Sequence, residues 1–116
     1  MKSSHALPPD EALVLIARHF AALGDPLRLK IVHALIAGEK NVGELVRVTG
    51  GLQANISRHL HKLVSAGVLV RRKQGNQAFY AIADPSIYGL CELVCGSLEQ
   101  RLAKLTKAIK VTAKRR

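Results

Sequence analysis

Aromatic residues are scarce in this chain of 116 residues, which has two phenylalanines, two tyrosines and no tryptophan. Proteins that bind single-stranded nucleic acid stack the bases on aromatic side chains, so the shortage argues against that class. The core must instead be aliphatic, which suits packed helices. A chain of this length is expected to form one domain with a modest core.

Long apolar runs and a cysteine framework are missing as well. The apolar run 12–17 is far too short to span a bilayer and is bracketed by Glu11 and Arg18, and no secretory segment is visible. Two cysteines four residues apart make no disulfide framework. We therefore expect a cytoplasmic protein without a membrane partner. The chain also lacks an acid/base pair, a nucleophile elbow and a phosphate loop, so we expect that it is not an enzyme.

Acidic residues are nearly absent from two stretches, which makes the net charge of +10 uneven. Residues 41–77 contain six lysines and arginines against one acid, Glu44, and residues 101–116 contain seven and no acid. Residues 78–100 have three acids and no lysine or arginine. The cationic middle block is typical of proteins that contact DNA phosphates. The terminal run either solubilises the end of the chain or touches flanking DNA.

Periodicity and capping residues predict a mainly α-helical fold with one small β-hairpin. Asp25 and Pro26 form a strong helix start, Gly67 a left-handed helix end, and Gly75 a tight turn between two strands. Helices are expected at about 10–23, 26–37, 42–48, 53–66 and 86–110, and strands at 68–73 and 77–83.

Residues 41–82 carry the clearest functional signal. Their order is a short helix, a glycine turn, a polar-faced helix and a basic hairpin, which is a helix-turn-helix followed by a wing. The second of these helices keeps Ile56, Leu60 and Leu63 on one side and polar groups elsewhere, so it can enter the major groove. We expect a flexible arm at 1–9, a winged helix-turn-helix DNA-binding and dimerisation domain at 10–110, and a basic tail at 111–116.

The residue types of the polar helix and wing suggest individual roles. The first residues of a recognition helix lead into the groove, so we assign base or near-base contacts to Gln53, Ala54, Ser57 and Arg58. Phosphate contacts are assigned to His59, Lys62, Arg71 and Lys73, although His59 and His61 could equally be ordinary exposed helix residues. The whole candidate DNA interface is Gln53, Ala54, Asn55, Ser57, Arg58, His59, Lys62, Arg71, Arg72, Lys73 and Asn76.

Apolar stripes run along the first and last helices. The second helix should turn Leu29, Val32 and Ile36 towards the core. The stripe of the first helix is Leu13, Ile16, Ala17 and Phe20, and that of the last is Ile87, Leu90, Cys91, Val94, Leu98, Leu102, Leu105 and Ile109. The last helix has more apolar face than a small core can cover, so its expected partner is a second copy of the chain.

Three stretches together resemble the ArsR/SmtB family of bacterial winged-helix repressors. They are residues 22–32, residues 53–63 with the following 66–70, and the wing 71–80, and the similarity extends from about Ala12 to Leu105. The resemblance implies a homodimer built on the first and last helices, a pseudo-palindromic double-stranded DNA operator, and repression relieved by an inducer. Two alternatives stay open: a non-specific architectural DNA-binding protein that uses the basic tail, and a winged-helix protein-interaction module.

Two metal sites known in the family are absent from this sequence. Residues 43–47 lack the cysteines of one site, and only Asp84 remains of the ligands of the other. No cofactor is required, but Cys91 and Cys95, about 5–6 Å apart on one helix face, could bind a soft metal ion or arsenite. A third ligand would come from His5, His19 or the other subunit. Redox or sulfur sensing is an alternative, as is plain packing, because Cys91 is central on the apolar stripe and Cys95 is at its edge.

Overall fold

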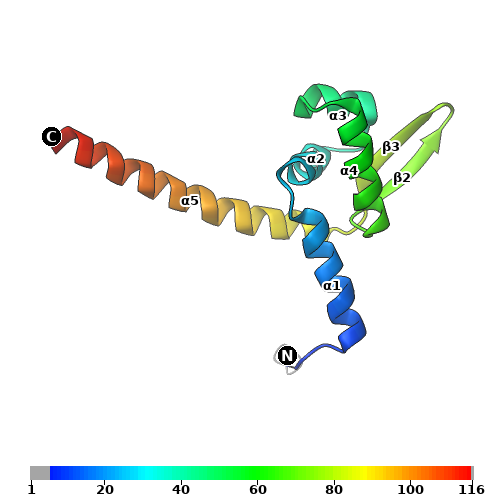
Figure 1. The fold of residues 1–116 in the computed structure, drawn as a ribbon, viewed down its shortest axis with the longest axis horizontal. Helices are drawn as coiled ribbons and strands as arrows, with labels where there is room; N and C mark the ends of the chain where they lie inside the picture. Colours follow the sequence, from blue (N-terminus) through cyan, green and yellow to red (C-terminus); the bar gives the residue numbers. More distant parts are fainter. Residues whose placement is uncertain (1–5, 116) are drawn as a thin grey trace. The chain divides into compact units, whose positions relative to one another are not determined.

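The computed structural model describes residues 6–115, without the side chains of Cys95 and of residues 110–115. Its elements in chain order are α1 (Asp10–Leu23), α2 (Pro26–Ile36), β1 (Lys40–Asn41), α3 (Val42–Thr49), α4 (Gln53–Ser65), β2 (Leu69–Gln74), β3 (Gln77–Ile82) and α5 (Ser86–Arg115) (Figure 1). The expected helices and hairpin are all present, and α5 is longer than expected. The chain divides into two compact units, Met1–Asp84 and Pro85–Arg116.

Side-chain caps fix the starts of α2 and α3. One carboxylate oxygen of Asp25 accepts hydrogen bonds from the backbone N–H of Leu27 (2.9 Å) and Arg28 (3.1 Å), and Pro26 begins the helix. Asn41 and Glu44 form a reciprocal capping box, with distances of 2.8 and 3.1 Å. These bonds satisfy N–H groups that have no partner inside the helix, so both helices start at defined residues.

A tight turn joins α3 to α4. Gly50 has a φ of 74°, a left-handed conformation that favours glycine. The hydroxyl of Thr49 donates to the carbonyl of Leu45 (2.6 Å) and accepts from the N–H of Gly51 (3.2 Å). A Cβ atom at Gly51 would lie 2.9 Å from the Cδ1 atom of Ile56, so the turn lies directly against α4. This contact fixes how the two helices of the helix-turn-helix meet.

The core of the first unit is aliphatic, as the composition predicts. Its fully buried side chains come from α2, α3, α4 and the start of the hairpin: Ile31, Val32, Leu35, Leu45, Ile56, Leu60, Leu63, Val68 and Leu69. The expectation for α2 was partly wrong, because Leu29 is 38% exposed. The helix packs on α3, α4 and β3 through the side that carries Ile31, Val32 and Leu35.

The wing is an antiparallel hairpin extended by a third strand that the sequence does not reveal. β2 and β3 pair around Gly75, which has a φ of 62°, and Arg71 lies opposite Tyr80. The two-residue β1 pairs with β3 on the other side, giving the strand order β1-β3-β2. Asn41 of β1 also donates through its side-chain amide to Gln77 of β3 (3.2 Å). The start of α3 is therefore attached to the wing.

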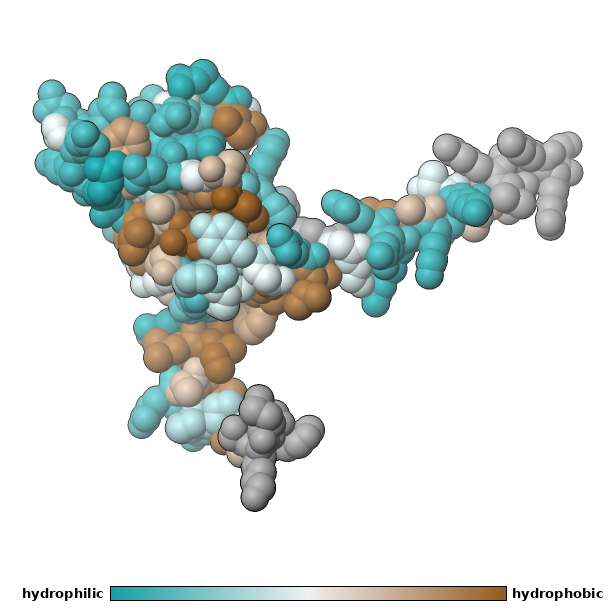
Figure 2. Space-filling view, turned by 180° about the vertical axis from the view of Figure 1, so that it is seen from behind, coloured by the Kyte–Doolittle hydropathy of each residue, from teal (hydrophilic) through white to brown (hydrophobic). Residues whose placement is uncertain are grey.

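The apolar stripe of α1 lies at the surface. Leu13 is 43%, Ile16 44% and Phe20 58% exposed, and Figure 2 shows this apolar surface on the helix. Within the described part of the chain, no helix is both long and apolar enough to cross a membrane. The first unit thus leaves an apolar helix face without cover.

The second unit is the single helix α5. Ile87 and Cys91 are 3% and 5% exposed, whereas the later apolar positions of the stripe, from Val94 to Ile109, are 48–62% exposed. Ile87, Leu98 and Ile109 are spaced 11 residues apart, which is 3.67 residues per turn over three turns. Because this value is close to the 3.6 of an α-helix, the stripe runs almost straight along α5.

Candidate nucleic-acid interface

The polar face of α4 lies at the surface, as the sequence predicts. Gln53, Ala54, Ser57 and Arg58 are exposed, whereas Ile56, Leu60 and Leu63 on the opposite side are fully buried. The guanidinium of Arg58 donates a hydrogen bond to the side-chain oxygen of the half-buried Asn55 (3.3 Å). This bond gives Arg58 a defined direction before any ligand is bound.

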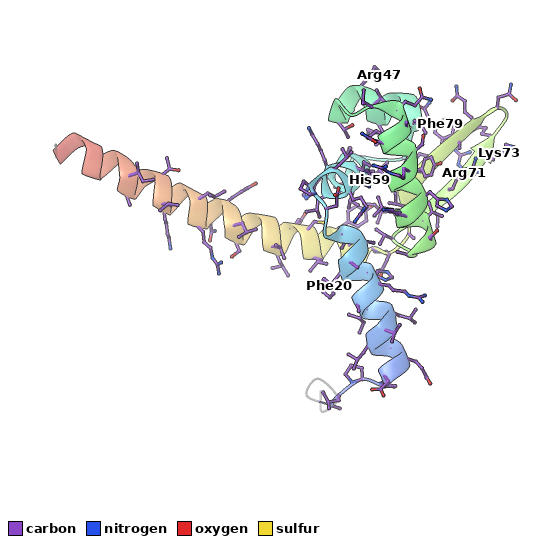
Figure 3. The ribbon with its side chains drawn as sticks, viewed as in Figure 1. Phe20, Arg47, His59, Arg71, Lys73 and Phe79 are labelled. Atoms are coloured by element: carbon purple, nitrogen blue, oxygen red, sulfur yellow. The ribbon has the colours of Figure 1, made fainter. Side chains whose placement is uncertain are left out.

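The cations of the wing differ in their surroundings. Arg71 and Lys73 are exposed on the wing (Figure 3), and within the described residues neither has a hydrogen bond or an ion pair. They are two residues apart on β2, so they extend from the same face of the hairpin. Both are available to an anionic partner. Asn76 is exposed in the turn at the tip.

Arg72 points to the other face and is engaged within the protein. Its guanidinium forms an ion pair with Glu39 (2.5 Å), donates to Gln74 (2.8 Å) and lies 5.0 Å from the centre of the Phe79 ring. The hydrogen bond with Glu39 raises the pKa of Arg72 above its ordinary value. Arg72 therefore contributes first to the structure of the wing, and its charge is less available than that of Arg71.

A cleft of about 660 Å³ lies between the start of α3 and the wing. Its lining includes Arg47 of α3, Arg71, Asn76 and Gln77 of the hairpin region, and no acidic residue. Figure 3 shows Arg47 and Arg71 on their two elements. Arg47 is one of the six cations of residues 41–77, but its place in the cleft is not visible in the sequence, because the cleft forms only when α3 and the wing come together.

His59 does not lie with the other candidate contacts. It is 9% exposed, and its Nδ1 atom lies 3.0 Å from a guanidinium nitrogen of Arg28 on α2 (Figure 3). Burial lowers the pKa of His59 below its ordinary 6.5, against the opposing effect of Asp25. The assignment of His59 as a phosphate contact is therefore corrected. Positions 56, 59, 60 and 63 follow the i, i+3, i+4, i+7 spacing of one helix face. The sequence therefore already indicated that His59 lies on the buried side of α4.

The remaining predicted DNA contact on α4 is Lys62, which is exposed, as is His61. The polar helix, the wing cations and the cleft all belong to the first unit. Together they present hydrogen-bonding and cationic groups, which suit a polyanion whose base edges carry hydrogen-bonding groups, as duplex DNA does.

The candidate sensor residues are only partly described. Cys91 is buried, while the side chain of Cys95 and all of His5 lie outside the described residues. His19 lies with its Nδ1 atom 3.3 Å from the carbonyl of Leu15. Among the described residues, no three His, Cys, Asp or Glu side chains come together as a metal site. The thiol-sensor hypothesis therefore stays a prediction.

Known proteins resemble this chain in both sequence and fold. The model of the bacterial regulatory protein arsR family matches residues 25–70, from the N-cap of α2 into the wing. The solution structure of a homodimeric winged helix-turn-helix DNA-binding domain from Mycobacterium bovis, a possible ArsR-family transcriptional regulator, superposes with a TM-score of 0.72 at 29% identity. That match covers 84% of this chain and 93% of the other.

Two relatives are named as regulators of metal resistance. The probable mercury resistance operon repressor of Streptomyces lividans is 38% identical over 66% of this chain, which spans 62% of that protein. The cadmium resistance transcriptional regulatory protein CadC of Listeria innocua is 35% identical over 76% of this chain and 75% of its own length. These relatives are regulators and not enzymes, as the sequence predicts. With this winged helix-turn-helix fold and these relatives, the chain belongs to the arsR family of bacterial regulatory proteins.

Proposed function

We propose that this chain is a dimeric transcriptional repressor that binds a specific sequence in double-stranded DNA. The observation that carries the proposal is the exposed polar face of α4, flanked by the unpaired cations Arg71 and Lys73 of the wing. The Mycobacterium bovis domain named as DNA-binding and the mercury operon repressor support it. A regulator of this kind acts on the chromosome, so the expected cytoplasmic location follows from the proposal.

The exposed face of α4 enters the major groove. Gln53, Ala54 and Ser57 contact base edges, and Arg58, oriented by Asn55, forms a bidentate contact with a guanine. Lys62 contacts the backbone beside them.

The wing and the cleft hold the DNA backbone. Arg71, Lys73 and Asn76 contact phosphates from the hairpin, and Arg47 contacts a phosphate from the opposite side of the cleft. These contacts set the register of the protein on the duplex and carry no sequence information themselves.

The dimer forms through the apolar faces of α1 and α5. Folded proteins rarely leave so long an apolar stripe in water, and a second copy of the same helix covers it symmetrically. Two copies place their recognition helices about one turn of DNA, roughly 34 Å, apart, so the operator is pseudo-palindromic.

The sequence of α5 fits an antiparallel pairing centred on Leu98. Apolar positions lie at equal distances on either side of this residue: Val94 and Leu102, Cys91 and Leu105, Ile87 and Ile109. In this register Leu98 meets its own copy, and Glu92 lies opposite the partner's Lys104. Ile87 and Cys91 are already buried in a single copy, so the exposed Val94, Leu98 and Leu102 make the contact between the two helices.

A soft metal ion, arsenite or another thiol-directed agent acting at Cys91 and Cys95 is the inducer in this proposal. The relatives named for mercury and cadmium resistance support a soft ion. The burial of Cys91 within a single copy favours the competing interpretation, in which the cysteines only pack.

Fluorescence anisotropy of labelled duplexes tests whether the protein binds DNA and whether it prefers one sequence. Wild-type protein should bind a duplex from upstream of its gene far more tightly than random duplex at the same salt concentration. Arg58→Ala should lose roughly 1–3 kcal/mol for each half-site of the operator and much less on random DNA. Equal affinities of the wild type for both duplexes would support a non-specific architectural protein instead.

The inducer is tested in the same assay with reduced protein and cadmium, arsenite or polysulfide. Loss of operator binding with one agent, abolished by Cys91→Ser with Cys95→Ser, would identify the class of signal. If no agent changes binding, the thiol-based inducer is wrong while DNA binding stands.

A further inference from the structure

Arg28 joins three segments of the first unit. Its Nε atom donates to the carbonyl of Ala22 (2.6 Å) and its Nη2 atom to that of Ala21 (3.4 Å), at the end of α1. Its Nη1 atom lies 3.0 Å from Nδ1 of His59 on α4. Its own backbone N–H donates to Asp25, the cap of α2. One side chain thus connects α1, α2 and the helix that carries the proposed base contacts.

The chemistry of this contact sets the protonation state of His59. A guanidinium has only donors, so Nδ1 of His59 must be the acceptor, and the neutral ring carries its proton on Nε2. Adding a second proton, at Nδ1, would convert the ring to an imidazolium, which has no acceptor and would place two cations 3.0 Å apart. Asp25 opposes this penalty, while Arg28, Arg58 and Lys62 add to it. From α1, the backbone carbonyls of Ala21 and Ala22 complete the surroundings of Arg28.

We infer that Arg28 and His59 are positioning residues for DNA recognition, and that protonation of His59 releases the recognition helix. The inference rests on the proposed DNA-binding function. Around α4, His59 lies about 160° from the exposed Ser57 and about 100° from the exposed Arg58, so the bond from the buried side to Arg28 sets how far these residues extend. Recognition groups must be held within about 0.5 Å of their productive position. Loss of the bond would allow α4 to move by more than that.

The sign of the pH dependence separates this role from direct phosphate contact. A histidine that touches phosphate binds a proton together with DNA, so acid strengthens its contact. A buried histidine that must accept a hydrogen bond has to lose its proton, so acid weakens binding. His61, two residues further on α4 and exposed, provides the comparison.

The test is operator affinity by anisotropy between pH 7.5 and 5.5 at constant ionic strength. We compare His61→Gln, which removes the exposed imidazole, with the double variant His59→Gln/His61→Gln. The first should lose affinity below pH 6.5, approaching tenfold per pH unit for each linked proton, and a dimer has two copies of His59. In the double variant this loss should disappear, because the glutamine carbonyl accepts from Arg28 and does not titrate. Affinity of His61→Gln that is constant or rises in acid would overturn the inference.

A purely structural role is tested by His59→Leu, which fills the space without an acceptor. At pH 7.5 it should bind the operator at least about tenfold more weakly than His59→Gln, with little change on random duplex. Equal operator binding by the two folded variants would show that His59 only packs.

The protonation state of His59 can also be measured directly in the wild-type protein, without any variant. Nitrogen NMR of the free wild-type protein at pH 7.5 should show His59 neutral with its proton on Nε2, and a proton on Nδ1 would overturn the inference. A wild type that never prefers operator over random duplex, at any pH, would instead contradict the proposed function.

Discussion

Replacing Arg47 by glutamine should change how DNA binding depends on salt. Arg47 and Arg71 line one cleft that contains no acidic residue. Each phosphate that a protein neutralises contributes about −0.9 to the slope of log affinity against log salt concentration. A dimer has two copies of Arg47, so the slope should become less steep by about 1.8. Between 50 and 200 mM salt, the wild type should then lose about 12-fold more affinity than Arg47→Gln.

The measurement is anisotropy over that salt range on operator and on random duplex. Because Arg47 is assigned to a phosphate, both duplexes should show the same change in slope. Lys30→Gln is the matched control: it removes one charge from an exposed position of α2 outside the cleft, and its slope should equal that of the wild type. An unchanged slope for Arg47→Gln, beside a reduced slope for Arg71→Gln, would refute a two-sided cleft.

Three further perturbations test the fold and the dimer. Leu98→Glu should convert the dimer to monomers in sedimentation velocity, because two carboxylates would face each other. Leu93→Glu, which lies off the stripe, should leave the dimer intact, and the same oligomeric state for both variants would rule out the proposed register. Gly51→Ala should lower the free energy of unfolding by about 1–3 kcal/mol, because its Cβ atom would lie 2.9 Å from a side chain of α4. Gly89→Ala, with open space at its Cβ, should raise that free energy by about 0.5–1 kcal/mol; a loss for both variants would contradict the packing. Since His59 has a lowered pKa in the folded protein, the unfolded chain gains its proton first, and stability should fall as the pH drops below 6.5; His59→Gln should remove that part of the fall in chemical denaturation.

Local signals in the sequence were sufficient for most of the fold. Asp25 and Pro26 define the start of α2, and the glycines at 50, 67 and 75 all have positive φ where turns or helix ends were expected. The spacing of Ile56, Leu60 and Leu63 correctly separates the core side of α4 from its polar side. Each of these signals involves residues that are neighbours in the chain, so no knowledge of the tertiary structure is needed.

Features that depend on distant residues were missed. β1 has two residues, too few for any periodicity, and it exists because β3 lies beside it. The cleft places Arg47 together with Arg71, 24 positions later in the chain. His59 was judged by its residue type, and its partner Arg28 lies 31 residues away. The residue types showed which groups could contact DNA, and only the packing showed which of them are free to do so.

Asn41 links the wing to the helix-turn-helix, so that the two parts are expected to move together. The same residue caps α3, pairs with β3 and holds Gln77 through its side chain. The hairpin therefore cannot tilt without loosening the start of α3. When such a body binds a duplex, the duplex has to supply most of the bending needed for a close fit. We expect base steps that bend easily, such as TA and CA/TG, to be favoured at operator positions that no side chain touches.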